Sequence, residues 1–253
     1  MRRDERVNLA PGALTAPLPP AIVSVGDLDN ANLITIGWTG ILATVPPKTY
    51  ISVRPTRHSY GMLKEGGEFV INLPSVSMAK AVDYIGIYTG KKVDKFKKCA
   101  LTKKKSEKVA PPTVAECPIA LECRVTEVIP MGSHDVFIAD IVGVSCHADI
   151  IDAEGKMHFE RADLLAYAHG EYYALGERVG RFGFSTDKPE KREAAPKKSD
   201  TEKKESRSEK IDTKTAKSNE PRPFYLDAPR SKSAKKKKPS DKDKGKRRGG
   251  SKR

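Results

Sequence analysis

The sequence predicts a mainly β domain, built as a closed or nearly closed antiparallel barrel with short helices, and a disordered C-terminal tail. Two observations lead to this prediction. Short stretches of apolar residues, several of them strictly alternating, recur through the first 185 residues between turn-forming Gly, Pro, Asp and Asn. After residue 185, Lys, Glu, Ser, Asp and Pro dominate, and such a segment does not bury enough apolar surface to offset its ordering entropy. We therefore expect a domain of residues 1–185 and a Lys-rich basic tail of residues 186–253.

The positive charge of the chain lies almost entirely in the tail. The whole chain has a formal net charge of +14. Residues 186–253 hold 25 Lys and Arg against 12 Asp and Glu, a net charge of +13, which leaves +1 for residues 1–185. The basic character of the chain therefore does not make the domain itself a nucleic-acid-binding fold.

The cysteines and the apolar segments indicate a reduced setting. The four cysteines are irregularly spaced and form no CxxC pair, which argues against a zinc site or a redox dithiol. Cys123 falls on the apolar face of an expected strand, and we expect it to be a buried free thiol. No signal-peptide pattern opens the chain, and no stretch approaches the ~20 apolar residues of a membrane span. We expect a cytoplasmic protein.

The first strands follow from apolar runs. Ala21–Val25 is a short apolar run, and residues 33–43 form a longer one that contains Gly37 and Gly40. Glycine inside a strand often marks a bulge or the close approach of another body to the backbone. Residues 48–54 alternate cleanly, which predicts a strand with one buried face.

Two short helices are expected around the next strand. Residues 57–64 have helical spacing, with Thr56 as the expected N-cap and a glycine pair at 66–67 as the end. Residues 68–73 alternate as a strand, and residues 76–88 have a helical pattern that Gly90 stops.

The second half of the domain opens with a surface loop. Residues 91–108 are Lys-rich and irregular, which indicates an exposed loop. Residues 119–125 alternate, and the alternation changes phase at Glu127, which predicts a β-bulge. Residues 136–144 are apolar on both faces, as in a buried strand, residues 164–175 are apolar and aromatic, and residues 177–184 are expected to finish the domain.

The chain carries none of the short motifs that mark common catalytic centres. GxSxG, HExxH and GxGxxG are absent, and residues 86–92 lack the glycine spacing of a phosphate-binding P-loop. The five histidines have no metal-ligand spacing. We therefore assign no catalytic residue and no metal site from the sequence.

Residues 54–59 have the composition of an anion site. Arg54, Thr56, Arg57 and Ser59 place two guanidinium and two hydroxyl groups at an expected strand-to-helix turn. Helix N-termini offer free N–H groups and a partial positive charge, and arginine adds fork-shaped donors that match phosphate oxygens. The alternative interpretation is a capped helix with surface arginines.

Two further segments are candidates for ligand contact. Residues 89–92, Thr-Gly-Lys-Lys, combine a hydroxyl, an exposed backbone and two ammonium groups at a helix end. Taken alone they are a helix stop, and they become a candidate if they lie beside residues 54–59. In residues 32–38, Gly37 would let a flat ring approach the backbone, whereas Trp38 is alternatively a core residue.

Several of these segments together resemble a known family. The motifs are NLITIGW at 32–38, two prolines at 46–47, ISVRPTRHSY at 51–60, GEFVINLP at 67–74, TGKKVDKF at 89–96 and YYALGE at 172–177. In this order and spacing they resemble the flavin reductase-like, FMN-binding split-barrel family, especially its flavoredoxin branch, over roughly residues 10–185. The chain departs from the family in the Lys-rich tract after Phe96 and in Thr89, where serine is common.

The resemblance implies a six-stranded antiparallel Greek-key split barrel, a homodimer, and FMN held near the subunit interface. It implies that the FMN phosphate lies near Arg57, Ser59, Thr89 and Lys91 or Lys92, and that the ring lies along residues 35–38. The cofactor-binding residues expected in this way are Asn32, Thr35, Ile36, Gly37, Trp38, Arg54, Thr56, Arg57, Ser59, Asn72, Thr89, Gly90, Lys91 and Lys92.

Three functions are compatible with these features. The first is an NAD(P)H-dependent flavin reductase, in which NADH or NADPH passes a hydride to FMN. The second is a flavoredoxin-type carrier that takes electrons from a protein partner, and the third is a flavin-binding module without turnover. The tail is either a solubilising extension or a polycationic arm for nucleic acid, ribosomes or an acidic redox partner, with residues 224–226 as an apolar island.

Overall fold

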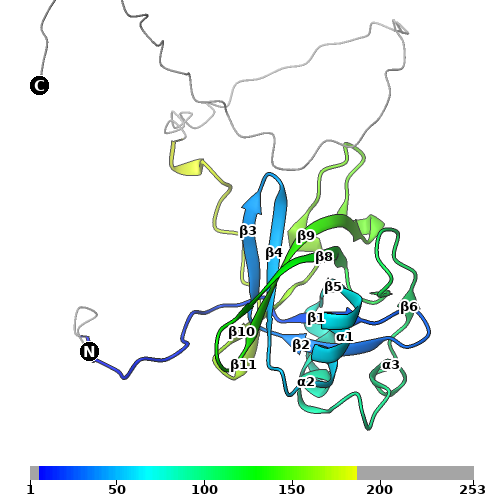
Figure 1. Cartoon of the computed structure of the whole chain (residues 1–253). Helices are drawn as coiled ribbons and strands as arrows, with labels where there is room; N and C mark the ends of the chain where they lie inside the picture. The colour runs from blue at the N-terminus through cyan, green and yellow to red at the C-terminus, as the bar shows by residue number, and fades with distance from the viewer. Residues whose placement is uncertain (1–5, 187–253) are drawn as a thin grey trace, which may run out of the picture. The chain divides into compact units, whose positions relative to one another are not determined.

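The computed structural model describes residues 6–186, which form an antiparallel β structure with short helices (Figure 1). The main sheet has seven strands in the order β2-β1-β5-β8-β9-β4-β3, and every pairing within it is antiparallel. Its strands are β1 (Ala21–Val25), β2 (Asn32–Ile36), β3 (Thr39–Thr44), β4 (Pro47–Val53), β5 (Glu68–Leu73), β8 (Ile119–Pro130) and β9 (Asp135–Cys146).

Two small sheets and several short helices accompany the main sheet. β6 (Lys103–Lys104) pairs with β7 (Thr113–Val114), and β10 (Leu165–Ala168) pairs with β11 (Glu171–Ala174). The helices are α1 (His58–Gly66), α2 (Ala79–Ile87) and α3 (Lys95–Lys98), with 3-10 turns η1 (Val76–Met78), η2 (Ala148–Ile150), η3 (Phe159–Arg161) and η4 (Phe184–Thr186).

The main core lies inside the barrel and follows from the alternation of the strands. Val23 and Val25 of β1 meet Ile51 of β4, Phe69 of β5 and Phe137 of β9, and all five are buried. Alternate residues of a strand point to opposite faces, so one side chain in two enters this core. The prediction that residues 48–54 form a strand with one buried face is therefore confirmed, because Thr49, Ile51 and Val53 are buried and the residues between them are half-buried.

A second core lies on the outer face of β1 and β2. Ile22 and Leu33 point away from the barrel and pack against Val82 and Ile85 of α2. β1 is consequently buried on both faces, which explains its continuous apolar run. This packing holds α2 against the strand whose end forms the candidate site.

The apolar run of residues 33–43 is two strands rather than one. β2 ends at Ile36 and β3 begins at Thr39, so Gly37 and Trp38 form the break between them. The main sheet therefore has seven strands where six were expected, although the mainly β antiparallel fold is confirmed. The bulge expected at Glu127 is also confirmed, because the register of β8 against β9 shifts between Val125 and Glu127.

The strand at residues 136–144 is less buried than the sequence predicted. β9 includes this segment, but most of its side chains are half-buried, and Val144 is 58% exposed. An apolar composition on both faces thus predicts the strand correctly but overstates its burial.

Helix α1 begins later than predicted and ends where predicted. Its N-cap is Arg57 rather than Thr56, and no side chain caps its first turn. Gly67 closes it with φ of 63°, a left-handed conformation that glycine adopts without steric cost, and its N–H donates to the Leu63 carbonyl. The expected stop at the glycine pair is confirmed.

Residues 91–108 are more ordered than the predicted surface loop. They contain α3 and β6, and Lys95, Phe96 and Ser106 are buried. The buried carboxylate of Glu122 accepts hydrogen bonds from the backbone N–H groups of Glu107 and Lys108. Specific tertiary contacts therefore hold a segment that looks irregular in composition.

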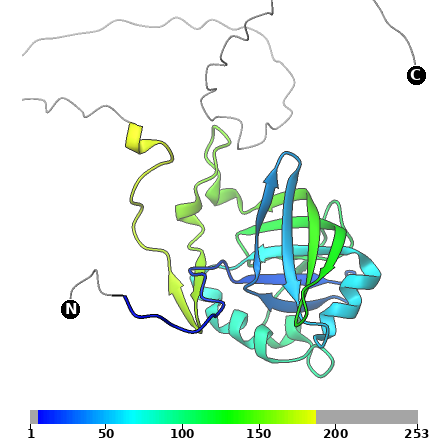
Figure 2. The ribbon, with the colours of Figure 1, turned by 60° about the vertical axis from the view of Figure 1, so that its left-hand side comes forward.

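The β10–β11 hairpin lies beside the N-terminal stretch of the barrel (Figure 2), where Leu18 bridges to Tyr167. The segment expected to finish the domain is instead largely exposed, with Val179 97% and Phe182 94% accessible. Residues 187–253, which include the apolar island at 224–226, lie outside the part of the chain that the structure describes.

Two expectations concern residues across the described part of the chain. All four cysteines are free, and Cys123 is fully buried, as predicted. Between residues 6 and 186, no helix is long and apolar enough to cross a membrane.

Candidate functional site

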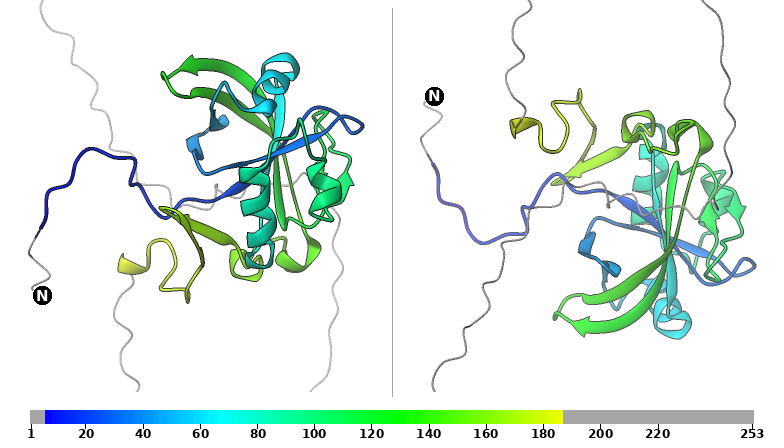
Figure 3. Two further views of the ribbon diagram at one scale, coloured as in Figure 1. Left: turned by 90° about the horizontal axis from the view of Figure 1, so that it is seen from below. Right: turned by 90° about the horizontal axis from the view of Figure 1, so that it is seen from above.

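A cavity of about 250 Å³ lies at the end of β2. Residues 34–38 line one part of it and residues 52–54 of β4 line another. His134 from the β8–β9 turn and two tyrosines of the β10–β11 hairpin, Tyr167 and Tyr172, also line it, together with Pro20, Arg57 and Gly86. Figure 3 shows the β8–β9 hairpin and the β10–β11 hairpin on opposite sides of the β3–β4 strands. Residues of both hairpins line the cavity, so segments distant in the sequence meet there.

A smaller cavity of about 160 Å³ adjoins the first one. Its lining includes hydroxyl-bearing Thr56, Ser59 and Thr89, together with Arg57 and Lys95, and no Asp or Glu. Hydroxyl, guanidinium and ammonium donors without a carboxylate make a site that favours an anion. We call the first cavity the ring cavity and the second the anion cavity.

Arg57 connects the two cavities, because Arg57 and Ile34 line both of them. One Nη atom of Arg57 donates a 2.6 Å hydrogen bond to the Gly86 carbonyl, which holds the guanidinium in place. Burial, together with the nearby Arg54 guanidinium, lowers the pKa of Arg57 below its usual range. An anion bound beside Arg57 would relieve both of these unfavourable effects.

Asn32, Ser59 and Gly90 bring three segments of the chain together at the anion cavity. The Nδ2 atom of Asn32 donates a 2.7 Å hydrogen bond to the Ser59 hydroxyl. A Cβ atom on Gly90 would overlap Asn32 Oδ1, so the backbone at residue 90 approaches this close only as glycine. The structure thus places Thr89 and Gly90 beside residues 56–59. This proximity is the condition that made residues 89–92 a candidate for ligand contact.

Lys95 is a residue of the anion cavity that the sequence reasoning missed. Its side chain is nearly inaccessible, and Nζ donates to the carbonyls of Leu33 at 2.7 Å and Ile85 at 2.9 Å. Burial, with a smaller effect of the Arg57 charge, lowers the pKa of Lys95 to about 8. The one sequence signal is Asp94, whose side chain caps α3 and fixes which residues of the lysine run face inward.

Not every expected residue lies at the two cavities. Asn72 is fully buried and lines neither one. Its Nδ2 donates to the Ile22 carbonyl and its Oδ1 accepts from the Val114 N–H, so its side chain ties strands together. Lys91 and Lys92 line a neighbouring hollow of about 410 Å³, which shares Asn32 and Gly90 with the anion cavity.

The structure places four side chains of the ring cavity that the sequence alone did not assign there correctly or at all. Trp38 is 37% exposed and lines the ring cavity, so it is not a core residue. Arg54 lines the ring cavity but not the anion cavity. It therefore does not share a cavity with the hydroxyl groups of Thr56 and Ser59, with which the sequence groups it. His134 and Tyr167 were missed, because nothing in their local sequence shows that they lie near β2. Tyr172 lies in a motif of the resemblance but was not named as a site residue.

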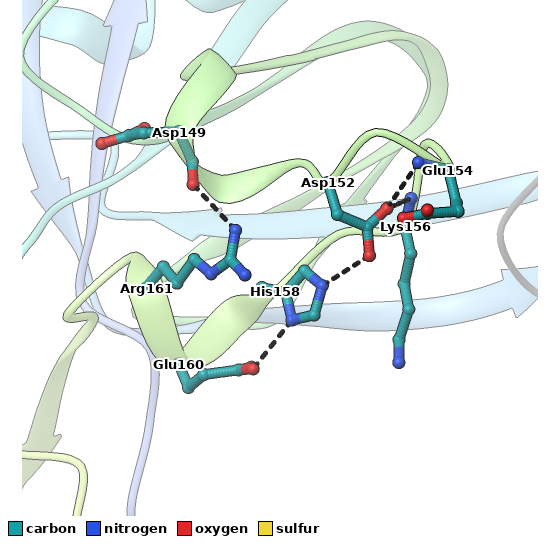
Figure 4. Close-up of polar contacts among 7 residues, drawn as sticks. All are labelled: Asp149, Asp152, Glu154, Lys156, His158, Glu160 and Arg161. Atoms are coloured by element: carbon teal, nitrogen blue, oxygen red, sulfur yellow. Dashed lines mark hydrogen bonds and ion pairs between the residues drawn. The ribbon is translucent and has the colours of Figure 1, made fainter. Parts of the chain in front are cut away.

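The polar cluster at residues 149–161 lies apart from both cavities. His158 contacts Asp152 through Nε2 at 2.7 Å and Glu160 through Nδ1 at 2.9 Å, and Arg161 donates to the Asp149 carbonyl (Figure 4). Both ring nitrogens are therefore engaged with carboxylates. Within residues 6–186, no group of His, Cys, Asp and Glu side chains is arranged to hold a metal ion.

The family model for the flavin reductase like domain matches residues 14–176, and the chain belongs to this family. The match spans the whole barrel and both cavities. Among curated proteins, an uncharacterized protein of Archaeoglobus fulgidus is 33% identical over 125 residues, which is 49% of this chain and 70% of that protein.

Solved structures show the same fold. The flavoredoxin of Desulfovibrio vulgaris (Miyazaki F) is 30% identical, with a TM-score of 0.68 over 72% of this chain and 100% of that chain. An FMN-binding protein from Thermus thermophilus, solved with bound p-hydroxybenzaldehyde, is 24% identical, with a TM-score of 0.59 over 72% of this chain and 99% of that chain. The first agrees with the resemblance found in the sequence, and the second shows the fold alone.

Proposed function

We propose that this chain binds FMN and acts as a flavin-dependent oxidoreductase of the flavin reductase type, with NADH or NADPH as electron donor. The observation that carries the proposal is the joining of the two cavities through Arg57. A carboxylate-free donor cluster beside a larger cavity with aromatic walls matches a molecule that has a phosphate at one end and a flat ring system at the other.

The donors of the anion cavity fit a phosphate. Ser59 and Thr89 offer hydroxyls, Arg57 a guanidinium and Lys95 an ammonium group. The first turn of α1 has no capping side chain and no acidic residue, so its positive end is not neutralised by the protein. These residues would hold the phosphate, with Lys91 and Lys92 close by.

The ring cavity fits a planar group. Ile36 and Trp38 flank Gly37, whose missing side chain leaves the backbone open to a flat ring, and Tyr167 and Tyr172 form a further aromatic wall. Bound FMN supplies the electron and hydride chemistry, and the surrounding residues bind it, orient it and exclude water. This division of labour explains why no nucleophile or acid–base pair is apparent.

The visible absorbance spectrum of the purified protein tests the proposal. We expect a flavin spectrum after purification or after addition of FMN, which bleaches when NADH or NADPH is added without oxygen. Failure to retain FMN would refute the flavin site. If the flavin stays oxidised with both nucleotides, neither NADH nor NADPH is the electron donor, but the proposal that the chain binds FMN still holds.

A second candidate function is a flavoredoxin-type electron carrier. The similarity to the D. vulgaris flavoredoxin, at 30% identity over the full length of that protein, favours it. In this case a reduced protein partner bleaches the flavin whereas neither nucleotide does. A flavin that no donor reduces at useful rates would instead indicate a binding module without turnover.

The homodimer is also part of the proposal. The β3–β4 hairpin carries exposed apolar side chains, with Ile41 67%, Leu42 50% and Val45 76% accessible. An apolar patch of this kind is typical of a protein–protein interface. Light scattering should give twice the mass of one chain, and Ile41→Asp should shift it toward the monomer.

We further propose that the basic tail, residues 186–253, contacts nucleic acid or an acidic partner. Its net charge of +13 favours such a contact. Binding to a nucleic acid through phosphates must weaken steeply as salt rises. A salt-insensitive association would instead point to the apolar island at 224–226.

The free state of all four cysteines supports a reducing, cytoplasmic setting.

A further inference from the structure

Arg54 lines the ring cavity and not the anion cavity. The sequence groups it with Thr56, Arg57 and Ser59 in one anion site. In the structure those three residues line the anion cavity, whereas Arg54 lines the ring cavity alone. A second positive charge therefore faces the space beside the proposed ring, apart from the phosphate donors.

The Arg54 guanidinium has no carboxylate partner among residues 6–186. Its Nε atom donates a 3.3 Å hydrogen bond to Nε2 of His134, and its Nη groups donate to no described residue. The carboxylate of the neighbouring Asp135 accepts a hydrogen bond from the Tyr60 hydroxyl. No Asp or Glu lines the ring cavity, so the Arg54 charge is uncompensated there.

His134 orients Arg54 instead of neutralising it. Because Nε2 accepts the hydrogen bond from Arg54, His134 is neutral and carries its hydrogen on Nδ1, which lies 2.9 Å from the Ser133 hydroxyl. Burial, together with the Arg54 charge, lowers the pKa of His134 and keeps the ring neutral. The Nε position of Arg54 is thus occupied, and its two Nη groups are left for a ligand.

We propose that Arg54, held by His134, recognises the anionic group of a second substrate that enters the ring cavity, and that this substrate is a planar conjugated molecule bearing a carboxylate or a phosphate. Trp38 and Tyr167 supply aromatic surface for a planar molecule. The free edge of a guanidinium matches the two oxygens of such an anion. The inference rests on the proposed flavin site, because the substrate shares the cavity with the ring.

The test uses the full-length protein loaded with FMN and four measurements on each variant. The first is the dissociation constant of FMN. The others are titrations with benzoate, phenyl phosphate and neutral benzamide, followed by the change each causes in the visible flavin spectrum. Benzoate and benzamide have nearly the same shape and differ in charge, and the two anions distinguish a carboxylate from a phosphate as the recognised group.

We expect an anion to bind the wild-type protein at least tenfold more tightly than benzamide. Arg54→Gln should weaken anion binding at least tenfold while the affinities for benzamide and FMN stay within twofold. Arg54→Lys should recover part of the loss, because it restores the charge without the fork. Arg178→Gln removes the same charge from an exposed position outside both cavities and should change nothing.

Three results would overturn the inference, and they are distinguishable. Equal binding of anions and benzamide would show that the cavity does not select charge. Loss of FMN affinity in Arg54→Gln would make Arg54 a cofactor ligand. If the wild-type protein retains no FMN, the proposed function itself fails, and the inference fails with it.

Discussion

The side-chain amide of Asn32 donates a hydrogen bond to the hydroxyl of Ser59, and this bond joins the first residue of β2 to the first turn of α1. Both side chains are buried, and Gly90 packs directly against the same amide. Three segments that are far apart in the sequence are therefore fixed relative to one another at the anion cavity. The geometry of this junction determines whether the hydroxyl of Ser59 is available to a phosphate.

Gly90→Ala should weaken FMN binding. The added Cβ would overlap Asn32 Oδ1 and force the amide away from Ser59, or residues 89–92 away from the cavity. We expect the dissociation constant of FMN, measured by fluorescence titration, to rise about tenfold or more, which corresponds to ~1.4 kcal/mol. Unchanged FMN affinity would show that the junction does not contribute to the site.

Gly61→Ala is the matched control for this substitution. Gly61 is an exposed residue within α1, and a Cβ there meets no atom within 4 Å. Alanine should stabilise the helix by up to ~1 kcal/mol because it restricts the unfolded chain. We expect a higher melting temperature and an unchanged FMN affinity.

FMN binding should weaken as the pH rises above about 8. The pKa of Lys95 is lowered to about 8 in the free protein, and a bound phosphate would raise it by favouring the ammonium form. Binding therefore takes up a proton between the two pKa values, and the affinity falls as pH rises through that window, by up to about tenfold per pH unit. FMN titrations from pH 6.5 to 9.5 measure this dependence.

Riboflavin and Lys95→Met provide the controls for the pH dependence. Riboflavin lacks the phosphate, so its affinity should not follow the titration of Lys95. Lys95→Met removes the titrating group, and its FMN affinity should be lower at pH 7 and flat through pH 8. A pH dependence that survives in Lys95→Met would assign it to another group.

Two of the four thiols should react with a thiol reagent in the folded protein, and the other two should be protected. Cys117 and Cys123 are buried, and burial raises the pKa of Cys123 to about 12 and that of Cys117 further, so neither forms the reactive thiolate. Cys99 and Cys146 are half-buried. A disulfide reagent at pH 8 should titrate two thiols in the folded protein and four in guanidinium. Rapid reaction of all four in the native state would contradict the buried positions.

The His158 cluster should stabilise the fold within a limited pH range. Its carboxylate partners raise the pKa of His158 above 6.5, so its contribution is complete below pH 6.5 and is lost as pH rises through the raised pKa. The pKa values of Asp152 and Glu160 are lowered from 3.8 and 4.5, so their contribution is lost as pH falls through those lowered values. The melting-temperature difference between wild type and His158→Gln should therefore be largest near pH 5 to 6. A constant difference from pH 5 to 9 would contradict this account.

The sequence alone determined most strands of the main sheet, the helix stop at Gly67 and the bulge near Glu127, but not the break between β2 and β3. These features depend on local patterns, because alternation and glycine placement act within a few residues of each other. It also identified residues 54–59 as rich in anion-binding groups. It misplaced the N-cap and mistook residues 91–108 for an exposed loop, because composition does not show which lysine of a run is buried.

Only the tertiary structure decided which of these groups work together. Both Arg54 and Arg57 line the ring cavity, but only Arg57 also reaches the anion cavity. It buried Lys95 between the carbonyls of Leu33 and Ile85, and it brought Tyr167 to the end of β2. Each of these positions results from packing between segments that are distant in the sequence. A local sequence pattern does not show which residue a side chain contacts across the barrel.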